Sequence, residues 1–427
     1  SKKFKSPKLL KKARINSKEV KKNDIFFAIK GKKNNGNLFI KESFKKGASL
    51  AVVNKIDKTL KPQKQILVKD SLKVLTNIAK KIRLTSKAKI IAITGSCGKT
   101  SLKEILGYVF GKISNVSYSP NSYNNKYGVP LSLFNIKQKD EFGVFEVGMD
   151  RIGEIDFLSK IIMPDVAVIT NISYAHAKNF KSINEIAKAK SEIIYNVNKN
   201  GSIVLNADDP FYSKHKAIAL NRKIKVLSFS ISKKNTNVYI EKIVKKINKF
   251  EIFININDKK YSFLVKSIFE SNLKNILAAV AVISIFKDID ELNQNVFYNF
   301  KIPTGRGDIS EVKVNKKIIK FIDESYNANP LSVSSAIKNF DLIKNVKSKK
   351  NIILGDMLEL GKHSKKLHED LAYVINESKI DNVHVYGNSI KHTFNKIKKR
   401  KKGLFLKDKK QIINLIKNNI NNNDYLM

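Results

Sequence analysis

The sequence predicts an α/β protein of three domains, and three observations support this prediction. From about residue 84, apolar runs of strand length alternate with segments of helical length, which is typical of parallel sheets. The alternation restarts after a cluster of Pro and Gly at residues 301–307, which predicts a linker. The length of 427 residues exceeds that of one compact core. We expect domains at residues 1–83, 84–300 and 301–427.

The first range predicts a small α/β domain. It contains a strand-like run at residues 24–31, followed by apolar segments at residues 39–40, 51–53 and 66–68.

The second range predicts a mostly parallel sheet. Its strands are expected at apolar runs that are separated by helical segments: residues 90–93, 144–146, 166–170 and 203–205. Residues 222–268 indicate antiparallel strands, and residues 271–287 indicate an apolar helix.

The third range predicts a doubly wound, Rossmann-like domain. Strands are expected at residues 318–322, 352–354 and 383–386, with helical segments between them.

Composition limits the classes of function. Lys and Arg total 82 against 37 Asp and Glu, a net charge of +45, but the excess is nearly all Lys and is spread along the chain. This spread argues against a dedicated nucleic-acid surface, although the charge attracts anionic nucleotides. The single cysteine excludes an intramolecular disulfide and a cysteine metal cage. No segment approaches the about 18 apolar residues of a membrane span, so we expect a cytoplasmic protein.

A glycine loop follows the strand at residues 90–93. Gly95 and Gly98 allow backbone N–H groups to curl around a phosphate, and Lys99 and Thr100 follow at the start of a helix. In this pattern the lysine reaches the outer phosphates and the threonine reaches Mg²⁺. The loop therefore predicts a nucleoside triphosphate site; the alternative is a Gly-Ser turn without a ligand.

Two polar residues lie where apolar strands end. Glu146 closes one strand, and His176 follows the strand at residues 166–170. Ligands bind at the carboxyl ends of parallel strands, so these side chains are candidates to share a divalent metal. The alternative for His176 is a structural role.

Five motifs, in order along the chain, resemble those of the ATP-dependent Mur ligases. They are Thr94-Gly-Ser-Cys-Gly-Lys-Thr-Ser101, Asn121-x-x-Asn-Asn-x-x-Gly-Val-Pro130, Glu146-Val-Gly, Pro164-Asp-Val-Ala-Val-Ile-Thr-Asn171 with His176, and Ala187-Lys-Ala-Lys-Ser-Glu192. Two later motifs resemble the branch that adds D-alanyl-D-alanine to UDP-N-acetylmuramoyl-tripeptide: Asp323-Glu-Ser-Tyr-Asn-Ala-Asn-Pro330 and Leu354-Gly-Asp-Met-Leu-Glu-Leu-Gly361.

The resemblance implies an N-terminal domain for the UDP end of the substrate, a central ATPase and a C-terminal domain for the dipeptide. It also implies that the tripeptide carboxylate attacks the γ-phosphate of ATP to give an acyl phosphate, from which the amine of D-Ala-D-Ala then displaces phosphate. A carboxylate alone is a poor electrophile, and phosphorylation corrects this. Such chemistry depends on positioning and charge neutralisation. We expect a monomer that acts on these small molecules.

The resemblance also assigns residues. It implies ATP contacts from the phosphate loop and from three distant positions: Gly95, Ser96, Cys97, Gly98, Lys99, Thr100, Ser101, Asn275, Arg306 and Asp323. It implies two Mg²⁺ ions, one held by Thr100 and Glu146 and a second held with the help of His176. Lys190 aligns with a lysine that is often carbamylated, a modification that would let it bind metal.

Further residues are implied on the substrate side. Asn125 is placed with the catalytic residues and Asn124 with the substrate, although the sequence leaves open which of them points inward. The residues expected to line the dipeptide site are Tyr326, Asn327, Asn329, Asp356 and Glu359. The alternative for Asp356 and Glu359 is to cap the next helix, and His368 is expected to be structural.

The chain departs from the family pattern at several positions. Family members commonly carry Asp-Ser-Arg and Asp-Gly-His where this chain has Asn16-Ser-Lys18 and Asn35-Gly-Asn37, and Ser271 replaces the usual His. These motifs therefore do not assign the residues that contact UDP. The chain stops at Asp424-Tyr-Leu-Met427, inside the expected last strand and before the family's Lys-Gly-Ser loop. We expect a C-terminal domain truncated at its end.

Three alternatives remain. The sister Mur ligases that add diaminopimelate or lysine, and folylpolyglutamate synthase, share the ATPase core. The Asp-Asn-Pro-Arg motif of the diaminopimelate-adding enzymes is absent, and Asn327-Ala-Asn-Pro330 favours the dipeptide-adding branch. The alternative from another class is a basic P-loop module that binds nucleic acid.

Overall fold

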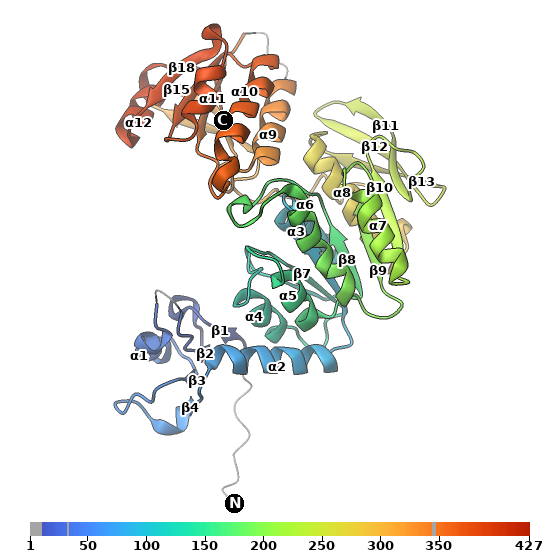
Figure 1. Ribbon diagram of the computed structural model, residues 1–427, viewed down its shortest axis with the longest axis vertical. Helices are drawn as coiled ribbons and strands as arrows, with labels where there is room; N and C mark the ends of the chain where they lie inside the picture. The colour runs from blue at the N-terminus through green and yellow to red at the C-terminus, as the bar shows by residue number, and fades with distance from the viewer. Residues whose placement is uncertain (1–10, 32–33, 344–346) are drawn as a thin grey trace, which may run out of the picture.

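The protein has an α/β fold built on three separate sheets. The computed structural model describes residues 11–31, 34–343 and 347–427. The sheets follow one another along the long axis of the molecule, with the N-terminal sheet at one end and the C-terminal sheet at the other (Figure 1). The predicted fold class, with mostly parallel sheets, is confirmed.

The N-terminal sheet has four parallel strands in the order β1-β2-β3-β4. They are β1 (Ala13–Arg14), β2 (Ile25–Phe27), β3 (Leu50–Val53) and β4 (Gln65–Leu67). Residues 39–40, grouped above with strand-like segments, are not a strand. The side chain of Asn35 caps a 3₁₀ turn at Gly36–Phe39, which leads into α1 (Ile40–Lys45) and buries Ile40 under the sheet.

Helix α2 (Ser71–Thr85) leads from the first sheet to the second and crosses the expected boundary at residue 83. Asp70 caps its first turn. At its other end, Arg83 Nε donates to the carbonyl of Ile162 at 2.8 Å, and Arg83 Nη2 lies 3.2 Å from Asp165 Oδ2. The end of α2 is therefore fixed to the central part of the molecule.

The central sheet has nine strands in the order β13-β12-β11-β10-β9-β8-β5-β7-β6. They are β5 (Lys89–Thr94), β6 (Val116–Tyr118), β7 (Phe142–Glu146), β8 (Val166–Ile169), β9 (Ser202–Asn206), β10 (Lys225–Ser230), β11 (Val238–Lys246), β12 (Lys249–Ile256) and β13 (Lys259–Val265). The four strands predicted for this range are confirmed. The prediction that antiparallel pairing begins at residue 222 is wrong, because β10 pairs in parallel with both β9 and β11. Helix α7 (Tyr212–Asn221) provides the crossover that a parallel neighbour needs.

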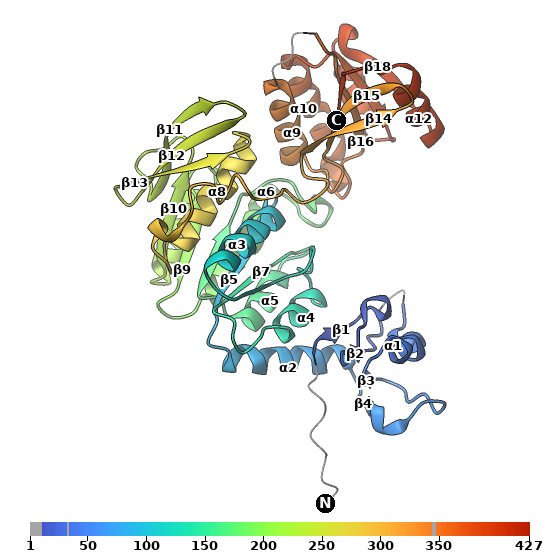
Figure 2. The same ribbon diagram turned by 180° about the vertical axis from the view of Figure 1, so that it is seen from behind.

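Both faces of the central sheet are buried. Ile90 and Ala92 of β5 pack on one side, and Ile91 and Ile93 pack on the other. The first side is covered by α4 (Gly128–Phe134), α5 (Glu154–Ile162), α6 (Ile183–Ser191) and α7. The second side is covered by α3 (Lys99–Ile113) and α8 (Glu270–Ile283), which lie on the near face in Figure 2.

The C-terminal sheet has six strands in the order β14-β15-β19-β16-β17-β18, with only β14 antiparallel to its neighbour. They are β14 (Asp308–Val314), β15 (Lys317–Asp323), β16 (Lys350–Gly355), β17 (Asn382–Tyr386), β18 (Lys402–Leu406) and β19 (Tyr425–Leu426). The helices are α9 (Pro330–Leu342), α10 (Ser364–Glu377), α11 (Lys391–Lys396) and α12 (Lys409–Asn418). The three strands predicted here are confirmed, and β19 lies between β15 and β16.

In the described part of the chain, no helix is both long enough and apolar enough to cross a membrane.

Candidate functional site

A cavity of about 790 Å³ lies where the carboxyl ends of the central and C-terminal strands face each other. It is lined by the phosphate loop, the ends of β7 and β8, helices α6 and α8, and the segment that leads into α9. All the site residues named above line it except Gly95, Asp323 and Asp356. Parallel strands collect their following loops at one edge, which explains why distant residues meet here.

The phosphate loop needs both of its glycines. Gly95 has φ = 147°, and a Cβ there would lie 1.9 Å from Thr170 Oγ1. Gly98 has φ = 83°, and a Cβ there would lie 2.8 Å from Asn275 Oδ1. Helix α3 begins at Lys99, so its N-terminus faces the loop. The Lys99 ammonium donates to the carbonyl of Gly95 at 2.7 Å, which places it across the loop.

The end of β8 holds this loop in shape. The backbone N–H of Cys97 donates to Asn171 Oδ1 at 2.9 Å, and Thr170 Oγ1 donates to the carbonyl of Cys97 at 2.6 Å. Ser96 Oγ donates to the carbonyl of Ser173 at 2.8 Å. The sequence reasoning did not single out Thr170 or Asn171 as supports, although both lie at a strand end in a quoted motif.

Glu146 is fully buried, and one of its oxygens has no hydrogen-bond partner. Asn124 Nδ2 donates to Oε2 at 3.3 Å, while Oε1 receives no hydrogen bond from the described residues. Lys103 Nζ lies 3.7 Å from Oε1. A buried carboxylate oxygen left without a donor is costly, and a hard cation such as Mg²⁺ prefers such an oxygen. Glu146 therefore fits a metal ligand.

Lys103 is a functional candidate that the sequence reasoning missed. It lies one turn after Lys99 on α3 and is fully buried. Its ammonium donates to the carbonyls of Ser119 and Asn121, each at 2.7 Å, and lies 2.7 Å from Glu104 Oε1. The contacts hold the segment before the two asparagines against β7. No sequence signal separates Lys103 from the many other lysines.

The two neighbouring asparagines have different surroundings. Asn124 reaches Glu146, as described above. Asn125 Oδ1 instead accepts the backbone N–H groups of Tyr127 and Gly128, both at 3.0 Å, which begins α4. Asn124 therefore has its side chain at the candidate metal site, and Asn125 shapes the loop at the cavity wall.

Lys190 projects from α6 with only 2% of its surface exposed. Among residues 11–31, 34–343 and 347–427, its ammonium has no hydrogen bond or ion pair. Burial, together with the nearby charge of Lys99, holds the pKa of Lys190 well below its ordinary value. A lower pKa increases the fraction of the neutral amine, which is the nucleophilic form.

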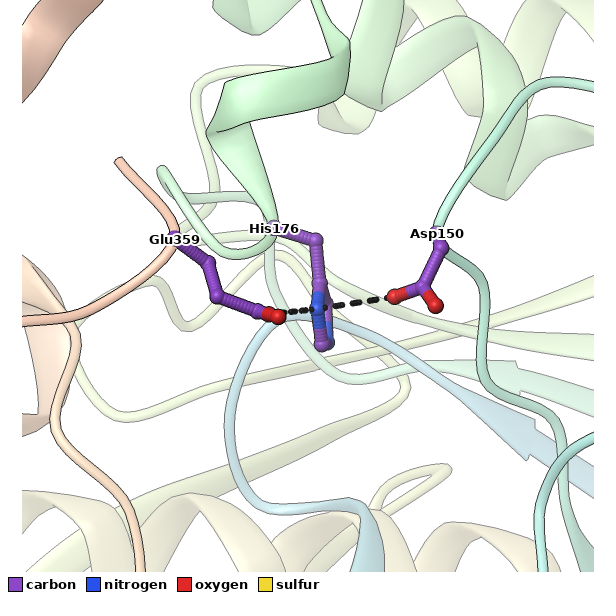
Figure 3. A group of neighbouring side chains, drawn as sticks. All are labelled: Asp150, His176 and Glu359. Carbon is purple, nitrogen blue, oxygen red and sulfur yellow. Dashed lines mark hydrogen bonds and ion pairs between the residues drawn. The ribbon is translucent and has the colours of Figure 1, made fainter. Parts of the chain in front are cut away.

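His176 lies between two carboxylates, as Figure 3 shows. Its Nδ1 atom is 2.5 Å from Glu359 Oε2 and 3.1 Å from Asp150 Oδ1. Glu359 belongs to the C-terminal part of the chain, whereas His176 and Asp150 follow strands of the central sheet. The Lys178 ammonium lies 2.8 Å from Glu359 Oε1 and, with His176, lowers the pKa of the Glu359 carboxyl. The three atoms lie within 4.8 Å of one another, but a metal ion shared by all of them would need Nδ1 without its hydrogen, whereas the 2.5 Å contact with Glu359 is that of an N–H donating to a carboxylate.

On the C-terminal side of the cavity, one acidic residue that lines the wall is Glu324, which follows the expected Asp323. The Asp323 carboxylate accepts the backbone N–H of Ser325 at 2.9 Å and does not line the cavity. Glu324 does line it, and burial raises its pKa to about 7 despite the charge of Arg306. The Arg306 guanidinium lies over the ring of Tyr326 at 4.2 Å from its centroid. Successive side chains of an extended chain point in opposite directions, so only one of the two adjacent acids faces the cavity. In the sequence, the signal that could have pointed to Glu324 was its position next to Asp323 in the same motif.

Asn329 connects the phosphate loop to α9. Its Oδ1 atom accepts the backbone N–H of Ser332 at 3.0 Å and caps the helix. Cys97 Sγ donates to the same oxygen at 3.1 Å, and burial raises the pKa of the Cys97 thiol. Tyr326 Oη shares a hydrogen bond with Ser122 Oγ, which is a second link between the two sides.

Asp356 has a structural environment. Its carboxylate accepts three backbone N–H groups that precede α11: Asn388, Ser389 and Ile390. The carboxylate therefore stabilises a turn at the edge of the C-terminal sheet rather than the next helix. Met357 N donates to the buried His368 Nε2 at 3.1 Å, which gives His368 a partner inside the C-terminal core.

A second cavity, of about 630 Å³, lies between the N-terminal and central parts. Asn16, Ser17 and Lys18 line one side, and Tyr123 and Tyr127 line the other. The Asn35 and Asn37 side chains instead form contacts within the N-terminal part, since Asn35 caps the 3₁₀ turn and Asn37 Oδ1 accepts the N–H of Asn54 at 3.0 Å.

Comparison with known proteins agrees with this geometry. Residues 93–283 match the Mur ligase middle domain, and residues 310–427 match the Mur ligase, glutamate ligase domain. The chain is 33% identical over 404 residues to UDP-N-acetylmuramoyl-tripeptide--D-alanyl-D-alanine ligase of Rickettsia prowazekii, covering 93% of this chain and 87% of that one. The Buchnera aphidicola protein of the same name is 33% identical, covering 93% and 88%.

Solved structures give the same result. MurF from Acinetobacter baumannii superposes with a TM-score of 0.84 at 26% identity, covering 99% of this chain and 90% of that one. MurF ligase from Thermotoga maritima in complex with ADP superposes with a TM-score of 0.79 at 26% identity, covering 98% and 93%. The chain belongs to the Mur ligase family.

Proposed function

We propose that the protein is an ATP-dependent ligase that joins D-alanyl-D-alanine to UDP-N-acetylmuramoyl-tripeptide in peptidoglycan precursor synthesis. The observation that carries the proposal is one cavity in which a phosphate loop and a buried Glu146 oxygen that accepts no hydrogen bond from the described residues face the segment before α9. The Rickettsia prowazekii and Buchnera aphidicola relatives, each 33% identical and matching 93% of this chain, are both named as ligases of this branch, which supports the choice of branch.

The proposed chemistry needs charge neutralisation more than proton transfer. The tripeptide carboxylate attacks the γ-phosphorus of ATP, forms an acyl phosphate and releases ADP. The amine of the dipeptide then attacks the acyl carbon, and phosphate leaves. Lys99 and the backbone N–H groups at the start of α3 would bind the phosphates, because the positive end of this helix faces the loop.

Mg²⁺ bound in this cavity would screen the negative charge that keeps a carboxylate away from a triphosphate. Glu146 fits as a ligand because its Oε1 atom lacks a donor, and Thr100 lies at the start of α3 beside the same cavity. His176 would help to hold a second ion. We propose that Lys190 is carbamylated, since its depressed pKa leaves an amine able to react with CO₂.

The remaining contacts follow the cavity wall. We propose that Asn275 and Arg306 bind the nucleotide and that Glu324 does so beside Arg306, with Asp323 as a support for the strand end. Tyr326, Asn327 and Asn329 would face the dipeptide. The second cavity, with Lys18 at its edge, is the candidate site for the UDP end. We further propose that the protein is cytoplasmic, because ATP and a UDP-linked precursor are its substrates, and that it acts as a monomer.

Phosphate release tests the proposal. Purified protein, ATP, Mg²⁺ and UDP-N-acetylmuramoyl-tripeptide are mixed with D-Ala-D-Ala, with glutamate or with single amino acids. We expect release only when the tripeptide nucleotide and D-Ala-D-Ala are both present. Release with another acceptor would assign the protein to a sister branch. Binding of nucleic acid that weakens steeply with salt, without acceptor-dependent release, would favour the P-loop module.

A further inference from the structure

The link between the central and C-terminal parts passes through a residue proposed above as a metal ligand. Segment 174–180, after β8, lies against segment 357–363, after β16. The backbone N–H of Lys178 donates to the carbonyl of Glu359 at 2.7 Å, and the rings of Tyr174 and His363 are 5.1 Å apart. Glu359 has φ = 62°, a conformation that is uncommon for a residue with a side chain. This junction defines where the Glu359 carboxylate lies.

The Glu359 carboxylate is occupied by the central part of the chain. Its two oxygens contact His176 Nδ1 at 2.5 Å and Lys178 Nζ at 2.8 Å. This arrangement differs from the expected role in the dipeptide site, because both oxygens already have cationic or N–H partners.

The contact determines which nitrogen of His176 carries the hydrogen. A carboxylate accepts but does not donate, so Nδ1 must be the N–H when it faces Glu359 and Asp150. In the neutral ring, Nε2 then keeps its lone pair. Nε2 forms no hydrogen bond within the described ranges, and His176 lines the large cavity. Histidines that bind metals commonly donate their other N–H to a carboxylate in this way, which raises their basicity.

We propose that Glu359 is a positioning residue that completes the His176 metal ligand only when the C-terminal part closes on the central part. The proposal rests on the proposed role of His176 as a metal ligand. The contact between Glu359 and His176 makes the metal site dependent on the C-terminal domain, which carries the dipeptide motif. Full metal binding then requires that this domain closes on the central part. Asp150 is the second acceptor of the same N–H and belongs to the central part, so it acts without closure.

Lys178 provides a matched control. Replacing it with Met removes one of the two ionic contacts of Glu359 across the junction and leaves the His176 contact in place. Glu359→Gln removes the charge behind Nδ1 and introduces an amide group that can turn to donate, which favours the wrong tautomer. If Glu359 only holds the two parts together, the two variants behave alike. If it orients His176, they differ.

The experiment measures Mn²⁺ binding by electron paramagnetic resonance with saturating ADP, for the full chain. We expect Glu359→Gln to weaken one Mn²⁺ site about 10- to 100-fold, more so in an Asp150→Asn background, and Lys178→Met to stay within about twofold of the unmodified protein. Unchanged affinity in Glu359→Gln in both backgrounds, or an equal loss in Lys178→Met, would overturn the proposal.

A His176→Ala variant distinguishes a failure of the proposed metal role of His176 from a failure of the proposed role of Glu359. If this variant binds Mn²⁺ as the unmodified protein does, His176 is not a ligand, and both its proposed role and the inference from it fail. If His176→Ala loses a site that Glu359→Gln keeps, the proposed metal role stands and only the role of Glu359 fails.

Discussion

The phosphate loop and the acceptor side of the cavity are built in different ways. The loop is enclosed in one domain, where Thr170, Asn171 and Ser173 bond to it from the neighbouring strand. The acceptor side contacts the central domain at a few points that join distant parts of the chain. Two of these contacts are Cys97 with Asn329 and His176 with Glu359. The nucleotide half is therefore preorganised within one domain, whereas the acceptor half depends on contacts between the two parts.

The largest expected effect comes from removing the charge inside the preorganised half. Lys99→Met deletes the ammonium that lies across the phosphate loop and leaves its backbone contacts intact. We expect acceptor-dependent phosphate release to fall by at least about 100-fold, in the range seen when one preorganised donor is lost. Rates are compared at saturating substrates, with circular dichroism to verify folding. A rate within tenfold of the unmodified protein would contradict the placement of ATP in this loop.

The next largest effect tests whether Lys103 supports Glu146 in the nucleotide half of the cavity. Lys103→Met removes the buried ammonium 3.7 Å from Glu146 and releases two carbonyls. Removing one partner of a buried pair costs about 3–5 kcal/mol, so we expect a lower Tm and also a higher Mg²⁺ requirement. Both are followed, by thermal denaturation and by phosphate release against Mg²⁺ concentration.

Lys350→Met is the matched control for Lys103. Lys350 is also buried, but its ammonium donates to the carbonyl of Asp341 at 2.7 Å, away from the cavity. We expect it to lower the Tm without changing the Mg²⁺ requirement. An equal Mg²⁺ shift in both variants would mean that Lys103 acts only on stability.

A smaller effect compares two asparagines at helix starts, one on each side of the cavity. Asn125 accepts the backbone N–H of Gly128 at the start of α4 in the central part, and Asn329 caps α9 and meets Cys97 across the interface. Replacing either with Ala should cost about 1 kcal/mol of stability. Only Asn329→Ala should also raise the KM for D-Ala-D-Ala, by roughly tenfold for a loss of about 1.4 kcal/mol. Equal KM values would show that the acceptor half does not depend on this contact.

The same difference explains what the sequence could predict. The phosphate loop, Glu146 and the buried strands follow from local spacing and apolar runs, so their positions were predictable. The Lys103 contacts, the choice of Glu324 over Asp323 and the pairing of His176 with Glu359 depend on side-chain direction and on closure between distant segments. Spacing along the chain contains no such information, and the parallel pairing of β10 was missed for a similar reason.

The smallest expected effect is the change in Tm when the buried Lys190 is replaced. The direction in which folding shifts the pKa of Lys190 determines whether this lysine stabilises or destabilises the fold. Folding lowers this pKa, mainly through burial, so the unfolded chain binds more protons between the folded and unfolded values. Stability therefore rises with pH across that window, and the lysine destabilises the fold at neutral pH.

In buffer without CO₂, we expect Lys190→Met to raise the Tm by about 2 °C or more at pH 7, with the difference shrinking as the pH approaches 10. Adding bicarbonate should stabilise the unmodified protein and leave Lys190→Met unchanged, because only the lysine can form a carbamate. A Tm difference that does not vary with pH would show that the lysine is charged in the folded state, and would remove the physical basis for its carbamylation.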